Sequence, residues 1–230
     1  MKNLPLVTVV IPVYNCAKFL SEALDSVFAQ IYRPIEVIVV DDGSTDDSAD
    51  IVRDYPEVRY FYQLNQGVSV ARNLAIAAAK GEFIAFLDAD DTWKPNKLSI
   101  QISYMLEHPD VGITATHALS FLESETHLPE WFKPDKHLGD IEGIIPSTFV
   151  VRKNVFREIG DFSPDYRASE DMEWLCRAKD AQISITNLSE SLTLRRLHGD
   201  NLSWQMASTA SSRALKIFKE LIARKSRQNR

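Results

Sequence analysis

The chain has 230 residues, of which 45% are hydrophobic and 25% are charged, and its formal net charge is −6 at pH 7. These proportions are typical of an ordinary globular protein rather than a disordered or fibrous one, and the acidic balance disfavours bulk binding to nucleic acid. The two cysteines, Cys16 and Cys176, have no CxxC spacing, so the sequence indicates no disulfide framework and no zinc site.

The first half of the chain alternates strand-like and helix-like segments. Buried strands are predicted at 7–11, stopped by Pro12, and at 37–41, 59–62 and 83–87. Helices are predicted after Asn15 as the cap, with Leu20, Leu24 and Val27 on one face, and at 69–80, ended by Gly81. Strands separated by helices of this length predict right-handed crossovers and a largely parallel sheet.

From Pro95 onward the pattern is less regular. A helix is predicted to about residue 106, then a strand at 111–115, an exposed loop at 123–143, a strand at 147–151, and helices at 153–159 and 170–179. A loop of that length inside a compact domain is usually functional.

Two of the predicted strands run directly into carboxylates. The run 37–40 ends at Asp41 and Asp42, and the run 83–87 ends at the acidic segment 88–91. Ligands of open α/β sheets bind at the carboxyl ends of the strands, and carboxylates gathered there repel one another unless a cation lies between them. Magnesium or manganese, completed by substrate phosphates, fits such oxygen ligands. The pattern therefore predicts a metal-assisted enzyme that acts on a phosphorylated donor.

Several segments, taken in order, resemble the nucleotide-binding half of family-2 glycosyltransferases of the GT-A fold. They are TVVIPVYN at 8–15, VDDGSTD at 40–46, NQG at 65–67 with ARN at 71–73, and GEFIAFLDADD at 81–91, and the match continues more loosely at 160–162, 169–171 and 196–203. The resemblance implies a Rossmann-like, mostly parallel α/β sheet flanked by helices, with a less regular acceptor-binding C-terminal half. It also implies one domain over 1–203, in which 1–95 bind the nucleotide sugar and 96–203 the acceptor.

The resemblance places Pro12, Tyr14, Asp42 and Arg72 at the donor nucleotide. Tyr14 would stack on or border the base, Asp42 would accept hydrogen bonds from the ring N–H of the base, and Arg72 would offer forked donors to the base or to a carboxylate. Each residue also has an alternative interpretation that involves no ligand. In that interpretation Tyr14 is a core residue, Asp41 and Asp42 cap the following helix, and Arg72 is a solvated charge on a helix.

The segment Asp88-Ala89-Asp90 resembles the DxD element of this fold. Alternation along an extended chain would send both carboxylates toward the same side. The resemblance implies that Asp90 binds manganese or magnesium directly and that Asp88 binds the ribose or a metal-bound water, with Asp91 in support. His198 matches a histidine placed near the diphosphate and the metal, and its alternative is a surface position.

Asp171 follows Glu170 at the start of a helical pattern and resembles the ED element, in which the aspartate is the general base. A carboxylate in the first turn of a helix is also ordinary compensation of the helix dipole. Glu170 and Trp174 are expected to contact the acceptor. The implied reaction is an inverting transfer from a nucleotide sugar, a UDP-sugar by expectation, to a carbohydrate or lipid-linked acceptor in cell-surface polysaccharide or glycolipid synthesis.

Two other functions are compatible with acidic strand ends. A sugar nucleotidyltransferase would carry a glycine-rich phosphate loop after the first strand, where this chain has 12–15 without glycine. A receiver-like magnesium-binding module, which is not an enzyme, would leave the second half of the chain unexplained.

The tail at 204–230 is basic, and 211–224 space apolar residues as in an amphipathic helix. Such a helix lies on an anionic membrane, packs on its own domain or forms a homodimer. The N-terminal segment, interrupted by Pro5 and Pro12, is too short for a signal peptide or a membrane span. A cytoplasmic protein is therefore expected, with peripheral contact at the inner face of the membrane if the tail binds lipid.

Overall fold

The computed structural model describes residues 4–124, 126–142 and 145–206. The strands are β1 (Val7–Val13), β2 (Ile35–Asp41), β3 (Val58–Tyr62), β4 (Phe83–Phe86), β5 (Thr92–Trp93), β6 (Val111–Leu122), β7 (Gly139–Ile141), β8 (Val150–Arg152) and β9 (Ser184–Leu197). The α-helices are α1 (Ala17–Phe28), α2 (Ser48–Arg53), α3 (Val68–Ala78), α4 (Lys97–Glu107), α5 (Pro134–His137), α6 (Lys153–Ile159), α7 (Glu170–Asp180) and α8 (Leu202–Gln205). Short 3-10 helices cover Pro146–Thr148 and Pro164–Tyr166.

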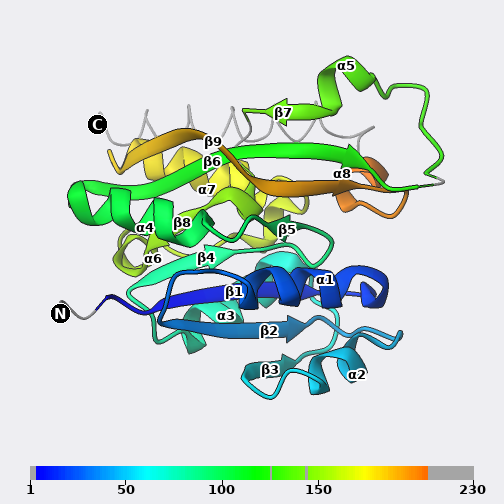
Figure 1. Cartoon of the computed structure of the whole chain (residues 1–230), viewed down its shortest axis with the longest axis horizontal. Coiled ribbons are helices and arrows are strands. Elements are labelled where there is room, and N and C mark those ends of the chain that lie inside the picture. Colours follow the sequence, from blue (N-terminus) through cyan, green and yellow to red (C-terminus); the bar gives the residue numbers. More distant parts are fainter. Residues whose placement is uncertain (1–3, 125, 143–144, 207–230) are drawn as a thin grey trace.

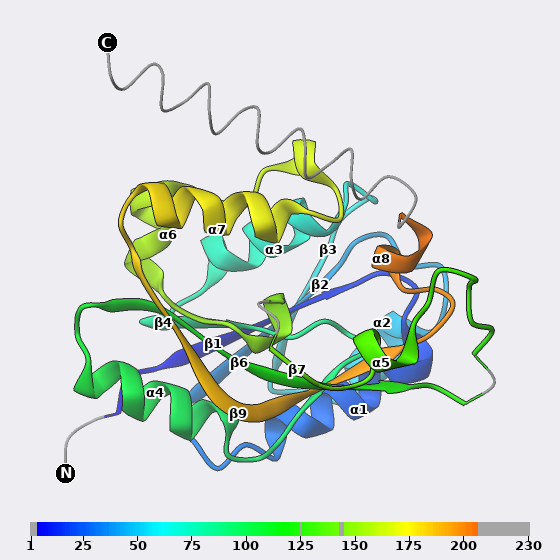
Figure 2. The same ribbon diagram turned by 90° about the horizontal axis from the view of Figure 1, so that it is seen from above.

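Within these residues the strands form one sheet in the order β3-β2-β1-β4-β8-β6-β9-β5, with β7 beside β6 (Figure 1). The first four strands are parallel, as predicted. Helices α1 and α4 cover one face of the sheet, and α3, α6 and α7 cover the other (Figure 2). The fold is therefore the predicted mixed α/β sheet flanked by helices.

The strands of the parallel half are buried on both faces. In β1, Val9 and Ile11 pack with Leu24 of α1 in one hydrophobic cluster, whereas Val10 packs with Ala75 of α3 in the other. A strand whose alternate residues enter two cores has to be apolar throughout. This is why the continuous apolar runs in the sequence identified these strands correctly.

The start of the chain differs from the prediction at two positions. Strand β1 does not stop at Pro12 but continues to Val13, because pairing with β4 ends at Val10 and no partner strand needs an N–H from Pro12 on that side. Asn15 does not cap α1. The backbone N–H of Ala17 instead donates to Asp46 Oδ2 at 2.8 Å, so the loop after β2 caps this helix.

The second half is more regular than predicted. Strand β6 continues seven residues beyond Ala115, to Leu122, and pairs in parallel with β9, a strand that the sequence analysis did not identify. The predicted loop at 123–143 contains α5 and β7. Strand β8 runs antiparallel to both β4 and β6, so it joins the two halves of the sheet.

In the described ranges, no helix is long and apolar enough to cross a membrane. The amphipathic helix predicted at 211–224 lies outside the described residues.

Candidate active site at the carboxyl edge of the sheet

The carboxyl ends of the parallel strands β1, β2 and β4 meet at one edge of the sheet, and the predicted donor residues follow them directly. Tyr14, just after β1, is 53% exposed, so the alternative of a core residue is wrong. Pro12, one residue before the end of β1, is buried opposite Val40 and forms part of the floor of this edge.

Asp41 and Asp42 are both buried at the end of β2 and organise different loops. Asp41 accepts hydrogen bonds from the backbone N–H of Ser44 and from the Tyr60 hydroxyl, both at 2.7 Å. Asp42 accepts bonds from the side chain of Gln63 at 2.7 Å and, at 2.8 Å, from the backbone N–H groups of Gln66 and Gly67. Neither carboxylate caps α2. Asp42 instead fixes the turn that leads into α3.

Arg72 lies inside the protein, where its side chain connects two carboxylates. Its Nη2 donates to Asp88 Oδ1 and its Nη1 to Glu170 Oε1, each at 2.7 Å. The residue is 3% exposed, and its guanidinium lies 5.7 Å from the centre of the Phe162 ring. The alternative of a solvated helix charge is therefore wrong.

The acidic segment after β4 is a turn rather than an extended chain, because the N–H of Asp91 donates to the carbonyl of Asp88 at 3.0 Å. The chain is therefore not extended here, contrary to what the prediction for Asp88 and Asp90 had assumed. Asp88 faces Arg72, whereas Asp90 Oδ2 lies 3.0 Å from His198 Nε2. Burial, with Asp90 and Asp88 close by, raises the pKa of the Asp91 carboxyl well above its usual value.

His198 is held at this turn and is not a surface residue. Its side chain is 12% exposed, and its ring packs on Phe19 with the ring centroids 4.9 Å apart. Asn201 also donates to Asp90 Oδ2, at 2.9 Å, and its own Oδ1 accepts the backbone N–H of His198 at 2.6 Å. The segment after β9 and the turn after β4 therefore form one unit.

This unit offers part of a metal site. Among the described side chains, no group of three or more His, Cys, Asp or Glu is gathered in a way that could hold a metal ion by itself. Asp90 and His198, whose Oδ2 and Nε2 lie 3.0 Å apart, are the side chains here that could contribute an oxygen and an imidazole nitrogen to a bound ion. A magnesium or manganese ion that takes its other ligands from substrate phosphates and water fits this set.

Asp171 lies in the first turn of α7, half-buried, where its Oδ1 accepts the backbone N–H of Met172 at 2.8 Å. Burial, and then the neighbouring charge of Glu170, raise the pKa of the Asp171 carboxyl to about 6. Glu170 itself is 4% exposed and accepts from Arg72 and from the N–H of Ser169. A carboxylate with a pKa near neutrality is suited to accept a proton.

The expectation that Trp174 contacts the acceptor does not fit the structure. Trp174 has no exposed surface, its indole N–H donates to the carbonyl of Gly160 at 2.9 Å, and its ring stacks on Phe156. The helical spacing that placed it near Asp171 in sequence turns it into the core between α6 and α7.

Arg196 was not identified as a site residue, although it lies in a segment that carried the resemblance. Its backbone N–H donates to Asp91 Oδ1 at 3.0 Å and its Nε to the carbonyl of Asp90 at 3.1 Å. Its other nitrogens bind Glu22 and Glu123, both at 2.5 Å. Ser147 also supports the turn, since its hydroxyl accepts the N–H of Asp88 at 3.1 Å, and no local pattern marks it.

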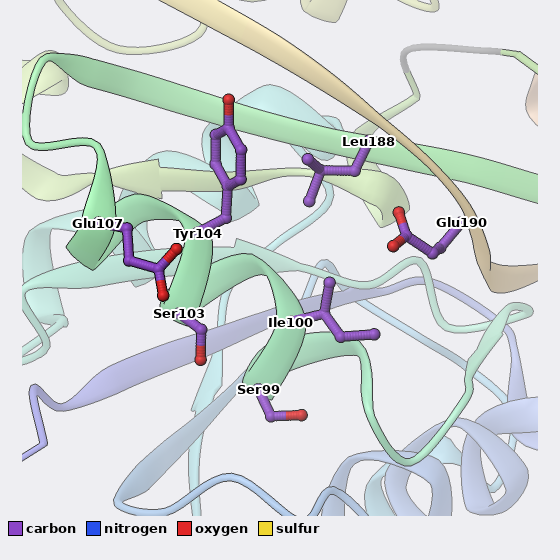
Figure 3. Close-up of a pocket in the computed structure, with 7 residues that line it drawn as sticks. All are labelled: Ser99, Ile100, Ser103, Tyr104, Glu107, Leu188 and Glu190. Carbon is purple, nitrogen blue, oxygen red and sulfur yellow. The ribbon is translucent and has the colours of Figure 1, made fainter.

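A pocket of about 420 Å³ lies elsewhere, between α4 and β9 (Figure 3). It is lined by Ser99, Ile100, Ser103, Tyr104, Glu107, Leu188 and Glu190. No residue predicted for the site lines it.

Comparison with known families gives a match over residues 8–167 to the model described as glycosyl transferase family 2. Among curated proteins, an uncharacterized glycosyltransferase of Nostoc sp. is 31% identical over 91% of this chain and 70% of its own length. TuaG of Bacillus subtilis, named as a teichuronic acid biosynthesis glycosyltransferase, is 40% identical over 88% of this chain and 84% of its own length.

Solved structures show the same fold. TarS 1-349 of S. aureus in complex with UDP-GlcNAc superposes with a TM-score of 0.68 and 23% identity over 86% of this chain. The mannosyltransferase PcManGT from Pyrobaculum calidifontis, in complex with GDP-Man and Mn²⁺, gives a TM-score of 0.74 and 19% identity over 96% of this chain. This chain spans 60% of the TarS chain, 65% of the PcManGT chain and 57% of a Rickettsia typhi relative.

Proposed function

Because the chain belongs to glycosyl transferase family 2, we propose that it transfers a sugar from a nucleoside diphosphate sugar to an acceptor hydroxyl, with inversion at the anomeric carbon. The observation that supports this most is that the donor-side carboxylate Asp88 and the helix turn carrying Asp171 meet at one sheet edge, joined by Arg72. A donor sugar bound there lies between the two, as a single displacement requires. Membership of the family sets aside the nucleotidyltransferase and receiver-like alternatives.

The donor is proposed to be a UDP-sugar. TarS has been solved with UDP-GlcNAc and PcManGT with GDP-Man, so two proteins of this fold bind nucleotide sugars. Tyr14 offers an exposed ring beside the base, above the floor made by Pro12. Asp42 Oδ2 accepts one described hydrogen bond, which leaves it acceptor capacity for a base N–H, and the partly exposed Asp88 is proposed to bind the ribose.

Asp90 and His198 are the residues that would hold a divalent ion, with Asp88 at the other end of the same turn. Magnesium or manganese bound there would supply Lewis-acid stabilisation of the negative charge that develops on the leaving diphosphate. The chain's own contribution is orientation. Asn201 holds the Asp90 carboxylate, and Arg196 holds the backbone of that turn.

Asp171 is the proposed general base, which takes the proton from the attacking acceptor hydroxyl. Its pKa of about 6 leaves it mostly ionised at neutral pH and still basic enough to accept a proton. No covalent intermediate is required, because the acceptor oxygen attacks the face of the sugar opposite the diphosphate.

The proposed acceptor is a carbohydrate or lipid-linked sugar of a cell-surface polysaccharide or glycolipid, in line with the role named for TuaG. The loop that connects β6 and β7 is the proposed acceptor loop.

Three further expectations remain proposals. They are a single domain over 1–203, a cytoplasmic location, and a role of the tail at the membrane or in a homodimer.

The test is to incubate the purified chain with UDP-, GDP- and dTDP-sugars and a panel of octyl glycosides, with Mn²⁺ or with EDTA. Metal-dependent release of nucleoside diphosphate, with NMR showing inverted configuration in the product, is expected. Formation of nucleoside triphosphate and sugar 1-phosphate from the nucleotide sugar and added pyrophosphate would indicate a nucleotidyltransferase. Labelling of an aspartate by acetyl phosphate would indicate a receiver-like module. A product of retained configuration would contradict the single displacement.

A further inference from the structure

Arg72 connects the two sides of the proposed reaction. It lies on α3 and reaches Asp88, which follows β4 on the donor side. It also reaches Glu170, the first residue of α7, which directly precedes the proposed base Asp171. These segments are 16 and 98 residues away from Arg72 in sequence, so the connection exists in the folded chain alone.

The guanidinium has no surface to offer a nucleotide. Arg72 is 3% exposed, both terminal nitrogens are hydrogen-bonded to carboxylates, and the aromatic ring of Phe162 lies beside the guanidinium. Its Nε is also buried and has no hydrogen-bond partner among the described residues. Contact with the base of the donor, as the family resemblance implied, would require this side chain to leave both carboxylates.

Glu170 depends on this arginine. It is 4% exposed, and its two oxygens accept from Arg72 and from the backbone N–H of Ser169. A buried carboxylate that loses its cationic partner is strongly unfavourable, so Arg72 determines whether Glu170 stays in this position. Glu170 in turn begins the helix turn that carries Asp171.

The charged groups that face Asp171 come from three elements. Glu170 on α7 and Asp88 after β4 both raise the pKa of the Asp171 carboxyl, whereas Arg72 on α3 lowers it. The arginine therefore offsets two negative charges beside the proposed base.

We propose that Arg72 is a positioning residue that fixes Glu170, and with it the first turn of α7, relative to Asp88, so that Asp171 faces the donor sugar as a carboxylate. This assignment rests on the proposed function. Of the two contacts expected of Arg72, with the base of the donor or with a carboxylate, it keeps the contact with carboxylates. It makes Glu170 a structural neighbour of the base instead of an acceptor ligand.

The test compares Arg72→Gln and Glu170→Gln by measuring kcat/KM against pH from 5 to 9. The acidic limb is the part of this profile where kcat/KM rises with pH as Asp171 ionises. Loss of Arg72 removes a positive charge, so the acidic limb should move up by about one pH unit and kcat should fall. Loss of Glu170 removes a negative charge, so the limb should move down. Arg72→Lys keeps the charge and should restore the position of the limb. Shifts of opposite sign are not expected from a packing defect.

Arg177→Gln is the matched control. Arg177 also pairs with a glutamate on α7, Glu173 at 3.0 Å, but it is not among the charges that act on Asp171. Its acidic limb should coincide with that of the wild type. If Arg72→Gln leaves the limb in place, the proposal is wrong.

Donor binding separates this role from a nucleotide contact. By calorimetry with Mn²⁺, Arg72→Gln should lose no more UDP affinity than Asp88→Asn does, because the arginine is expected to act on the donor only through Asp88. A collapse of UDP affinity with an unchanged acidic limb would return Arg72 to the base. If Arg72→Gln does not fold, the double variant Arg72→Gln with Glu170→Gln replaces it, because this variant removes both buried charges. The acidic limb of its kcat/KM profile should lie near that of the wild type, while kcat stays low.

A measurement that needs no turnover separates the proposed sugar transfer from the proposed role of Arg72. Carbon-13 NMR of the Asp171 carboxyl in the unliganded protein should give a higher pKa in Arg72→Gln and a lower one in Glu170→Gln. If the wild type transfers no sugar, the proposed function fails and these NMR shifts still test the role of Arg72. If they are absent in an active enzyme, Arg72 has no such role.

Discussion

Asp171 combines a functional position with an energetic cost to the fold. Its pKa of about 6 lies above the usual value of 3.8 because the side chain is buried beside Glu170. A carboxyl group that is more easily protonated in the folded state destabilises the protein once it ionises. The contribution of Asp171 to stability is therefore complete below pH 4 and is lost as the pH rises through 6.

Asp171→Asn should separate catalysis from stability. The amide cannot accept the acceptor proton, so kcat is expected to fall by about 10²–10⁴-fold. At pH 7 the variant should melt at a higher temperature than the wild type because an ionised, partly buried carboxylate has been removed. Steady-state kinetics and thermal melts measure both effects. Normal turnover would exclude Asp171 as the base and make Glu170 the next candidate.

The wild type should show the same group in its pH dependence. If Asp171 is the general base, its ionised form is the active one, so kcat/KM is expected to rise with pH through a limb near 6. The measurement is kcat/KM at saturating Mn²⁺ between pH 5 and 8. A limb that persists unchanged in an active Asp171→Asn variant would belong to another group.

Asp90→Asn tests the donor side. The change keeps the shape of the side chain but removes the charge that would offset a metal ion next to His198. Calorimetry should show the manganese-dependent part of UDP affinity lost. Glu22→Gln, a change on the outer side of Arg196, is the control and should retain it. Unchanged metal-dependent affinity in Asp90→Asn would remove it from the set of metal ligands.

The positions of the polar residues at the strand ends could be predicted from the sequence, but the side chains that the candidate site residues contact could not. The sequence places Tyr14, Asp42 and Asp88 at one edge because buried strands end just before them. It does not show that Arg72 turns inward to Glu170, 98 residues away, because that contact depends on how α3 and α7 pack. Trp174 fails for the same reason, since the sequence does not specify which face of α7 meets the core.

At the scale of elements, two aromatic side chains between β6 and β7 hold their part of the proposed acceptor loop against α8. Trp131 and Phe132 pack on Trp204 of α8, with ring centroids 5.8 and 5.2 Å apart. Helix α8 begins directly after Asn201, which binds Asp90. Trp131 is 42% exposed, so its ring offers a surface next to the proposed site on which the apolar face of a sugar can pack.

Trp131→Ala should therefore raise the KM for a disaccharide acceptor by about tenfold and leave the KM for the donor unchanged. Leu128→Ala is the control, because Leu128 is 43% exposed in the same loop and has no aromatic ring. Initial rates with the octyl glycoside that the wild type prefers provide the measurement. An acceptor KM equal to that of the wild type would place the acceptor elsewhere.

The elements differ in how clearly the sequence encodes them. Strands β1, β2 and β4 are continuous apolar runs because both of their faces are covered. Strand β9 is half-exposed over most of its length and carries serine, threonine and arginine, so no apolar run marks it. Its place in the sheet comes from pairing with β6, which is a contact between distant parts of the chain.

At the scale of the molecule, one sheet runs through both the proposed donor side and the proposed acceptor side, so ligand binding should stabilise the whole fold. UDP with Mn²⁺ at about one hundred times its dissociation constant should add roughly 2.7 kcal/mol to the free energy of unfolding. Scanning fluorimetry with and without EDTA measures this gain. An equal rise in melting temperature with UDP in EDTA would show that the metal contributes nothing to donor binding.

The position of β9 determines when the turn around Asp90 is completed during synthesis. This strand lies between β6 and β5 in the sheet, yet it follows every other described strand in the chain. His198 and Asn201, which complete the turn around Asp90, leave the ribosome just after it. A nascent chain therefore presents its donor-side carboxylates well before it can hold them in place. The turn around Asp90 is therefore complete only after β9 has inserted between β6 and β5.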